Sequence, residues 1–99
     1  MSDPKEILSE AAIEAHLESL APWALLDGYL VREDQPEDFR KALAWVNRVG
    51  MLAEEHNHHP DFHLTDWNRV TLRLKSHDVN GITDRDLRFA RAVNGLAQR

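Results

Sequence analysis

Residues 36–60 read PEDFRKALAWVNRVGMLAEEHNHHP and hold the longest regular pattern of the chain. Apolar side chains recur at helical spacing, which predicts a helix of about twenty residues that begins at Pro36. Gly50 lies inside this helix at a cost of about 1 kcal/mol relative to alanine, so we expect close packing against another backbone there. Asn57 is expected to end the helix in the left-handed conformation. The positions expected to face the core are Phe39, Leu43, Val46, Val49 and Ala53.

The chain before this helix predicts a shorter helix and a β-hairpin. Ser9 is expected to cap the first helix, whose apolar positions recur at helical spacing and which ends before Pro22. Residues 23–26 and 29–32 are apolar runs on either side of Asp27-Gly28. That pair tolerates the positive φ of a two-residue turn, so the runs predict two paired strands.

The chain after residue 60 predicts a second hairpin followed by a helix, as the first hairpin is followed by the long helix. Residues 61–64 are a short extended run, and residues 70–75 alternate apolar and polar side chains, with Lys75 at a polar position, which predicts a second hairpin. Asn80-Gly81 predicts a turn, and Thr83 with Asp86 three residues later predicts a capping box that opens a helix through residue 97. The order α-β-β-α-β-β-α predicts an α+β fold, a four-stranded antiparallel sheet with three helices packed on one face.

Size and composition limit the classes of function. Ninety-nine residues predict a single domain over residues 1–99, for which oligomerisation would bury more surface, with Trp45 and Leu52 as candidate interface residues. A net charge of -5 with mixed signs argues against a nucleic-acid binder, and the absence of cysteine excludes disulfides and thiol chemistry. The N-terminus lacks the basic segment followed by an apolar segment that marks a secretory signal, and the apolar runs are only a few residues long. We therefore expect a soluble cytoplasmic protein, without membrane contact, that binds small molecules or proteins.

Histidines form the clearest chemical cluster. Five of the six lie between His56 and His77, and imidazole exchanges protons near its ordinary pKa of roughly 6.5. His59 precedes Pro60 and must be extended, so the side chains of His58 and His59 diverge and serve different tasks. His77 ends the predicted strand and is their candidate partner. The other two, His56 and His63, are expected to be capping or surface residues.

Alternative interpretations compete for several of these residues. Imidazoles with Glu54, Asp61 or Asp78 would suit zinc or iron, but the spacing matches no established metal motif, so no metal site is predicted. The arginines of the last helix, Arg85, Arg88 and Arg91, are expected to form a solvated face. The three tryptophans are expected in the core or an interface, although Trp67 is a candidate to contact a flat substrate.

Three stretches together resemble a known family. They are Glu54-x-x-x-His58-His59-Pro60, the stretch from Asn68 to Asp78 that ends in Ser76-His77-Asp78, and Gly81-Ile82-Thr83-x-x-Asp86-Leu87. This pattern is similar to that of the pterin-4a-carbinolamine dehydratases, also known as dimerisation cofactors of a hepatocyte nuclear factor. Trp67 stands where the family commonly has tyrosine, Ile82 replaces a usual leucine, and the loop after Pro60 is one residue longer than in animal members.

The resemblance implies a hydro-lyase that converts 4a-hydroxytetrahydrobiopterin to quinonoid dihydropterin and so recycles the pterin of aromatic amino acid hydroxylases. It implies that His58 and His77 are the principal acid and base and that His59 assists or binds the pterin. Glu54 and Asp86 would orient imidazoles or bind the ring, and Asp86 has an equal claim as a capping residue. The remaining pocket residues would be Pro60, Ser76 and Asp78. The resemblance implies no cofactor. It implies assembly as a homodimer or homotetramer.

Two further hypotheses stay open from sequence. One is a non-catalytic module that docks on a hydroxylase or a transcription factor through the same fold. The other is a small metal-binding protein, which would carry stoichiometric metal. The acid and base roles of His58 and His77 are not assigned by sequence, because tautomer and pKa depend on contacts that only a structure provides.

Overall fold

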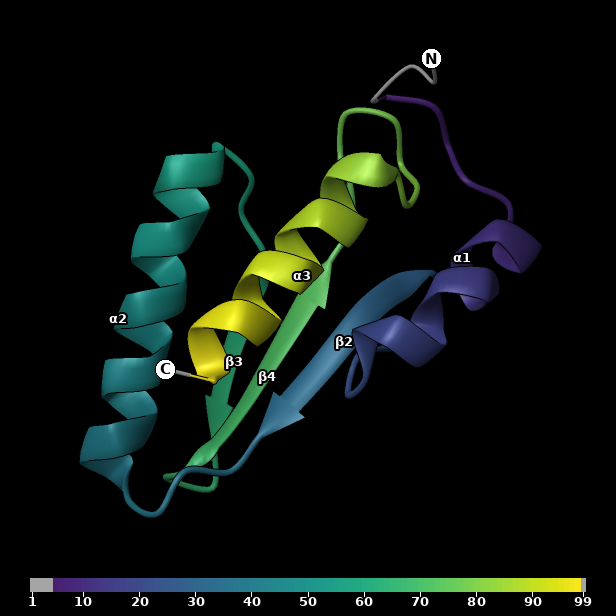
Figure 1. Cartoon of the computed structure of the whole chain (residues 1–99). Helices are drawn as coiled ribbons and strands as arrows, with labels where there is room; N and C mark the ends of the chain where they lie inside the picture. Colours follow the sequence, from purple (N-terminus) through teal and green to yellow (C-terminus); the bar gives the residue numbers. More distant parts are fainter. Residues whose placement is uncertain (1–4, 99) are drawn as a thin grey trace.

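The computed structural model describes residues 5–98 (Figure 1). In chain order the elements are α1 (Glu10–Leu17), a 3-10 turn η1 (Glu18–Leu20), β1 (Ala24–Leu26), β2 (Tyr29–Asp34), α2 (Phe39–His56), β3 (Asp61–Thr65), β4 (Arg69–Leu74) and α3 (Asp84–Ala97). This order confirms the α+β fold predicted from sequence. None of the helices in residues 5–98 combines the length and the apolar character needed to span a membrane.

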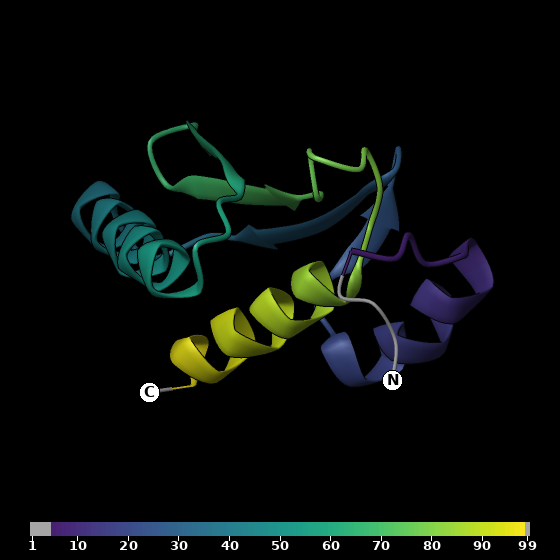
Figure 2. The same cartoon turned by 90° about the horizontal axis from the view of Figure 1, so that it is seen from above.

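The strands form one antiparallel sheet in the order β1-β2-β4-β3. The two hairpins meet where β2 pairs with β4, with Leu30 opposite Leu74 and Arg32 opposite Leu72. These side chains are buried beneath the helices, which gather on one side of the sheet (Figure 2). Alternate residues of β4, Thr71 and Arg73, therefore point to the other side and are only partly buried. The sheet thus has one face covered by helices and one open face.

Local turn and cap chemistry agrees with the sequence at most element ends. Ser9 caps α1 by accepting from the backbone N–H of Ala12 at 3.1 Å, and Asp27 and Gly28 have the positive φ values expected of their turn. Asn57 is left-handed at the end of α2, with φ 48° and ψ 43°. The start of α2 differs from the prediction: Asp38 is the cap and Phe39 the first helical residue, because the Asp38 carboxylate accepts from the Lys41 N–H at 2.8 Å.

The buried face of α2 also differs from the predicted stripe. The helix buries Ala42, Trp45, Val49 and Ala53, whereas Phe39 and Leu43 are exposed. Trp45, expected from sequence in the core or an interface, is a core residue of the chain. A Cβ added at Gly50 would meet nothing within 4 Å, so the close backbone packing predicted there is not made within residues 5–98. Apolar periodicity alone did not distinguish two neighbouring faces of one helix.

A partly buried polar network holds α3 against the sheet. Asn94 on α3 accepts from the Trp23 indole at 2.9 Å and from the guanidinium of Arg32 on β2, and it donates to Leu20 O at 3.2 Å. Arg32 also donates to Asp34 at 2.8 Å and 3.0 Å. Because buried polar groups without partners are costly, this network fixes how far α3 can slide along β2. The first turn of α3 is thereby placed beside the end of α2.

Candidate active site

The end of α2 delivers the first two histidines of the site. The left-handed Asn57 reverses the chain, and the N–H of His58 bonds back to Ala53 O at 3.1 Å. This turn points the His58 ring at α3, where it packs edge-on against Phe89 at 6.0 Å between ring centroids. The His58 side chain is only 12% exposed. Its neighbour His59 points elsewhere, as expected for adjacent extended residues, and pairs with the Glu54 carboxylate.

A fully buried carboxylate meets His58. Asp86 lies in the first turn of α3 with no exposed surface, and its Oδ1 is 2.6 Å from His58 Nε2. Its Oδ2 accepts from the Ser76 hydroxyl at 2.7 Å and from the Thr83 backbone N–H at 2.9 Å. The second of these bonds completes the capping box predicted from sequence. One carboxylate therefore caps α3 and binds a histidine at the same time.

The loop after β4 supplies the third histidine. Ser76 and Gly81 form a backbone bridge, with Ser76 N–H donating to Gly81 O at 2.9 Å and Gly81 N–H donating to Ser76 O at 3.3 Å. The loop they close presents His77 and Asp78. Arg85 of α3 donates to Asp78 at 2.7 Å, and this hydrogen bond holds the pKa of the Asp78 carboxyl below its ordinary value of 3.8. The loop is thus bound to α3 by the Asp78–Arg85 pair and by the Ser76–Asp86 hydrogen bond.

These elements enclose a cavity of about 180 Å³ that contains all three histidines predicted as catalytic. A smaller cavity of about 60 Å³ adjoins it and shares Asn57, His58 and Arg85. Lys75 and Arg85 also line the larger cavity, although sequence reasoning placed them on a polar strand position and a solvated helix face. For Arg85, the available sequence signal was Asp78 seven residues earlier, because the intervening Asn80-Gly81 turn brings the two opposite charges together. The full lining is Asn57, His58, His59, Lys75, Ser76, His77, Asp78 and Arg85.

Other predicted site residues lie around or away from this cavity. Glu54 reaches it through His59, whereas Pro60 is buried and does not line it. Trp67 lies in the turn between β3 and β4, at the opposite end of that hairpin, and is 62% exposed. Within one chain it does not line the histidine cavity, so its contact with a substrate stays a prediction.

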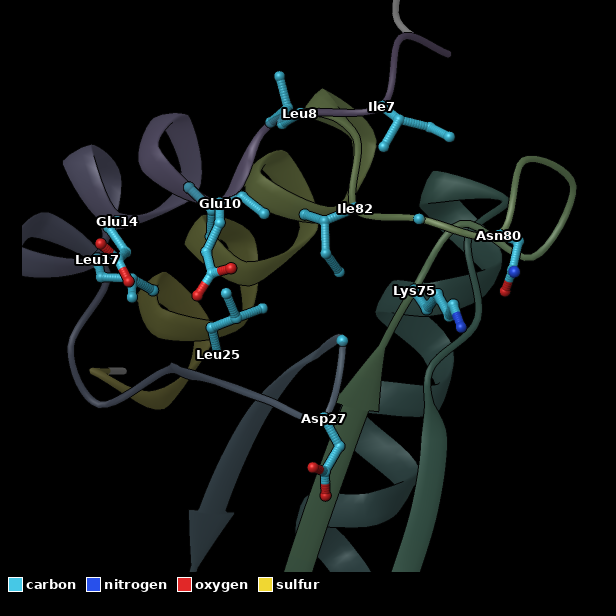
Figure 3. Close-up of a pocket in the computed structure, with 13 residues that line it drawn as sticks. Ile7, Leu8, Glu10, Glu14, Leu17, Leu25, Asp27, Lys75, Asn80 and Ile82 are labelled. Carbon is cyan, nitrogen blue, oxygen red and sulfur yellow. The ribbon is translucent and has the colours of Figure 1, made fainter.

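The histidine cavity is not the largest one. A groove of about 440 Å³ lies between α1, the β1–β2 turn and the end of the 76–81 loop (Figure 3). Its lining is mostly apolar, with Leu17, Leu25 and Ile82 facing the Glu10 carboxylate, and it contains no histidine. The imidazoles, whose ordinary pKa lies near neutral pH, make the smaller cavity the candidate site for proton transfer. No group of three or more His, Asp or Glu side chains within residues 5–98 is arranged to hold a metal ion.

Comparison with known proteins gives the family. A family model described as pterin 4 alpha carbinolamine dehydratase matches residues 6–96. The chain belongs to the pterin-4-alpha-carbinolamine dehydratase family. The resemblance seen in the sequence motifs is therefore confirmed over nearly the whole chain.

Relatives of the pterin-4-alpha-carbinolamine dehydratase family match over nearly their full length. A protein of Thermosynechococcus vestitus is 42% identical over 92 residues, which is 93% of this chain and 96% of the relative. One of Thermomicrobium roseum is 43% identical over 90 residues, 91% of this chain and 96% of the relative. Both are named, provisionally, as pterin-4-alpha-carbinolamine dehydratases. A solved structure from Brucella melitensis, titled transcriptional coactivator/pterin dehydratase, is 30% identical, with a TM-score of 0.84 over 93% of this chain and 99% of that one.

Proposed function

We propose that this protein is a 4a-hydroxytetrahydrobiopterin dehydratase that works by histidine general acid–base catalysis. The observation that carries the proposal is the contact of His58 Nε2 with the buried Asp86 at 2.6 Å, in a cavity also lined by His59 and His77. A histidine oriented by a buried carboxylate, with further imidazoles beside it, is the equipment that proton transfer at neutral pH requires. Membership of the family supports the choice of a pterin as substrate.

The reaction needs only two proton transfers. A base removes the N5 proton of the 4a-hydroxytetrahydropterin, the C4a–O bond breaks, and the departing hydroxide takes a proton from an acid and leaves as water. The electron pair of the N5–H bond forms the C4a=N5 double bond of the quinonoid dihydropterin. Imidazoles can supply both groups, each contributing about 10²–10⁴-fold to the rate, and no cofactor or metal is needed.

The neighbouring side chains would prepare these imidazoles rather than react. Asp86 has no exposed surface and would act through His58, while Glu54 would orient His59. Arg85 and Asp78 would hold the loop that carries His77. We propose His58 and His77 as the principal acid–base pair and place the enzyme in cytoplasmic recycling of the pterin used by an aromatic amino acid hydroxylase.

The test is the rate of 4a-hydroxytetrahydrobiopterin dehydration by chelator-treated protein, compared with His58→Ala and His77→Ala variants of verified fold. We expect turnover well above buffer in the wild type and a loss of about 100-fold or more in each variant. His63→Ala is the matched control, because His63 is exposed on β3 and does not line the cavity. Equal rates for folded wild type and buffer would refute the proposal.

A second candidate is a protein-binding module, favoured by exposed apolar surface on α2. Phe39, Leu43 and the partly buried Val46 form a stripe beside the buried face of that helix, and Gly50 leaves room along it for another backbone. The Brucella melitensis relative is titled a coactivator as well as a dehydratase. We propose that this stripe forms a homo-oligomer interface. A folded protein that oligomerises or binds a partner through the stripe but does not accelerate dehydration would favour the module.

A further inference from the structure

Two hydroxyl groups lie behind the Asp86–His58 pair, and the sequence motifs assign a catalytic role to neither. Ser76 Oγ and Thr83 Oγ1 are 2.8 Å apart, and both residues are buried. The Ser76 hydroxyl contacts Asp86, and the Thr83 hydroxyl contacts Ser76. The chain of contacts runs from α3, through the end of β4, and back to α3. Because each hydroxyl has one hydrogen and its contacts are known, every hydrogen in this chain of contacts can be assigned to an acceptor.

The hydrogens can be assigned from Asp86 outward. An ionised carboxylate only accepts, so the Ser76 hydroxyl uses its one hydrogen on Asp86 Oδ2 at 2.7 Å. Ser76 must then accept from Thr83, whose own oxygen accepts from the Arg85 backbone N–H at 3.2 Å. The direction is therefore fixed from Arg85 N–H to Thr83, to Ser76 and to Asp86. These bonds hold the Asp86 carboxylate in one orientation, with Oδ1 facing His58.

The same assignment fixes the proton on His58. Among residues 5–98, the hydrogen-bond partner of the other carboxylate oxygen is His58 Nε2, at 2.6 Å, and with Asp86 ionised that nitrogen donates. A neutral His58 ring then carries its proton on Nε2 and has a lone pair on Nδ1. Within residues 5–98, no hydrogen bond engages Nδ1. It is the ring nitrogen left to accept a proton.

We propose that Thr83 and Ser76 are positioning residues that, through Asp86, hold His58 in the Nε2–H tautomer and make its Nδ1 the base of the reaction. This inference rests on the proposed dehydratase function for its consequence, though not for its geometry. The N5 proton of the pterin passes to His58 Nδ1, and His77 supplies the proton that leaves with the hydroxide. Both imidazoles return to their starting state by exchange with water.

Ser76 is suited to this role rather than to substrate contact. Its hydroxyl is committed to Asp86 and Thr83, and its backbone N–H and C=O are committed to the 76–81 loop. Loss of its hydroxyl should therefore lower kcat without raising KM. A residue that bound the pterin directly would raise KM instead.

The tautomer can be read without substrate, by imidazole ¹⁵N chemical shifts of the full chain at about pH 9, well above the ordinary imidazole pKa of roughly 6.5. We expect His58 to be mainly Nε2–H in the wild type. Ser76→Ala and Thr83→Val each release the Asp86 carboxylate, so that Oδ1 is no longer held against His58 Nε2. Each should therefore lower the ratio of Nε2–H to Nδ1–H by about two- to tenfold, the range that one hydrogen bond gives. The kcat for dehydration should fall by a similar factor at constant KM.

Ser76→Ala separates this role from helix capping, because it leaves the Thr83 cap of α3 in place, and two further variants serve as controls. Thr83→Ser keeps the hydroxyl and should retain the wild-type tautomer, whereas Ser9→Ala removes the cap of α1 and should leave His58 unchanged. A wild-type His58 that is mainly Nδ1–H would overturn the proposal. So would an unchanged ratio in folded Ser76→Ala and Thr83→Val. If the tautomers behave as expected but the wild type does not dehydrate the pterin, the proposed function fails and the positioning role stands.

Discussion

Replacing Asp86 with asparagine should invert the proton arrangement of the site while keeping its shape. The amide oxygen is expected to face Ser76 Oγ and the Thr83 N–H, because both are donors. The amide nitrogen then faces His58 Nε2, and as a donor it requires that nitrogen to accept. The neutral ring must carry its proton on Nδ1, which removes the lone pair on that atom.

The magnitudes follow from the bonds that change. The two bonds from Ser76 and Thr83 become neutral ones, at about 1 kcal/mol each, offset in part because a buried amide costs less than a buried charge. We expect Asp86→Asn to lower the free energy of unfolding by about 1–2 kcal/mol, measured by urea denaturation. Loss of the base should lower kcat by about 10²–10⁴-fold. The protein would stay folded and lose its activity.

The control for this prediction is Asp84→Asn, two residues away on the same helix. Asp84 pairs with Arg88 at 3.1 Å on the surface, so its loss should cost less than about 1 kcal/mol and leave kcat unchanged. Wild-type kcat in a folded Asp86→Asn protein would refute the role given to the Asp86–His58 pair. An equal loss of kcat in both variants would refute it as well.

Three further predictions concern other parts of the fold. Arg85→Gln should raise the pKa of Asp78 toward 3.8, measured by carboxyl NMR titration; because the pKa is lowered in the folded state, the stabilisation by this pair is present above about pH 4 and is lost as the pH falls through the folded-state value. Leu43→Glu should shift an oligomer toward monomer in sedimentation velocity, because it places a charge in the exposed stripe of α2. Asn94→Ala should lower the free energy of unfolding by about 2–4 kcal/mol in urea denaturation, because it leaves the buried Arg32 guanidinium and the indole N–H without their shared acceptor.

Each of these three has a matched control. Arg88→Gln removes an arginine that does not contact Asp78 and should leave the pKa of Asp78 in place. Leu26→Glu changes an exposed leucine on β1, outside the stripe, and should leave the oligomer intact. Asn47→Ala removes an exposed asparagine of α2 and should change stability by less than about 0.5 kcal/mol. Effects of equal size in variant and control would contradict the corresponding prediction.

The sequence predicted features that depend on local chemistry. The left-handed Asn57, the Asp27-Gly28 turn and the Thr83 cap are set by residues within a few positions of one another, and all three are confirmed. The strands followed from period-two alternation and turn residues for the same reason. The grouping of His58, His59 and His77 was expected because they follow the predicted long helix and a predicted strand. The structure places all three in the lining of one cavity.

Features that depend on tertiary contacts were not predictable in this way. Phe39 and Leu43 fit helical spacing as well as the true core residues do, and only packing against α3 and β4 decides which face is buried. The contact between His58 and Asp86 joins residues 28 positions apart, so no spacing rule describes it. Sequence treated capping and site roles as alternatives for Asp86, whereas its two oxygens serve one role each.

The most direct test of the account is a stopped-flow measurement of 4a-hydroxytetrahydrobiopterin dehydration by wild type and His58→Ala at neutral pH. The account predicts rapid dehydration by the chelator-treated wild type and a rate at least about 100-fold lower in the folded variant. A wild-type rate equal to that of buffer, or a folded His58→Ala protein as fast as the wild type, would contradict it.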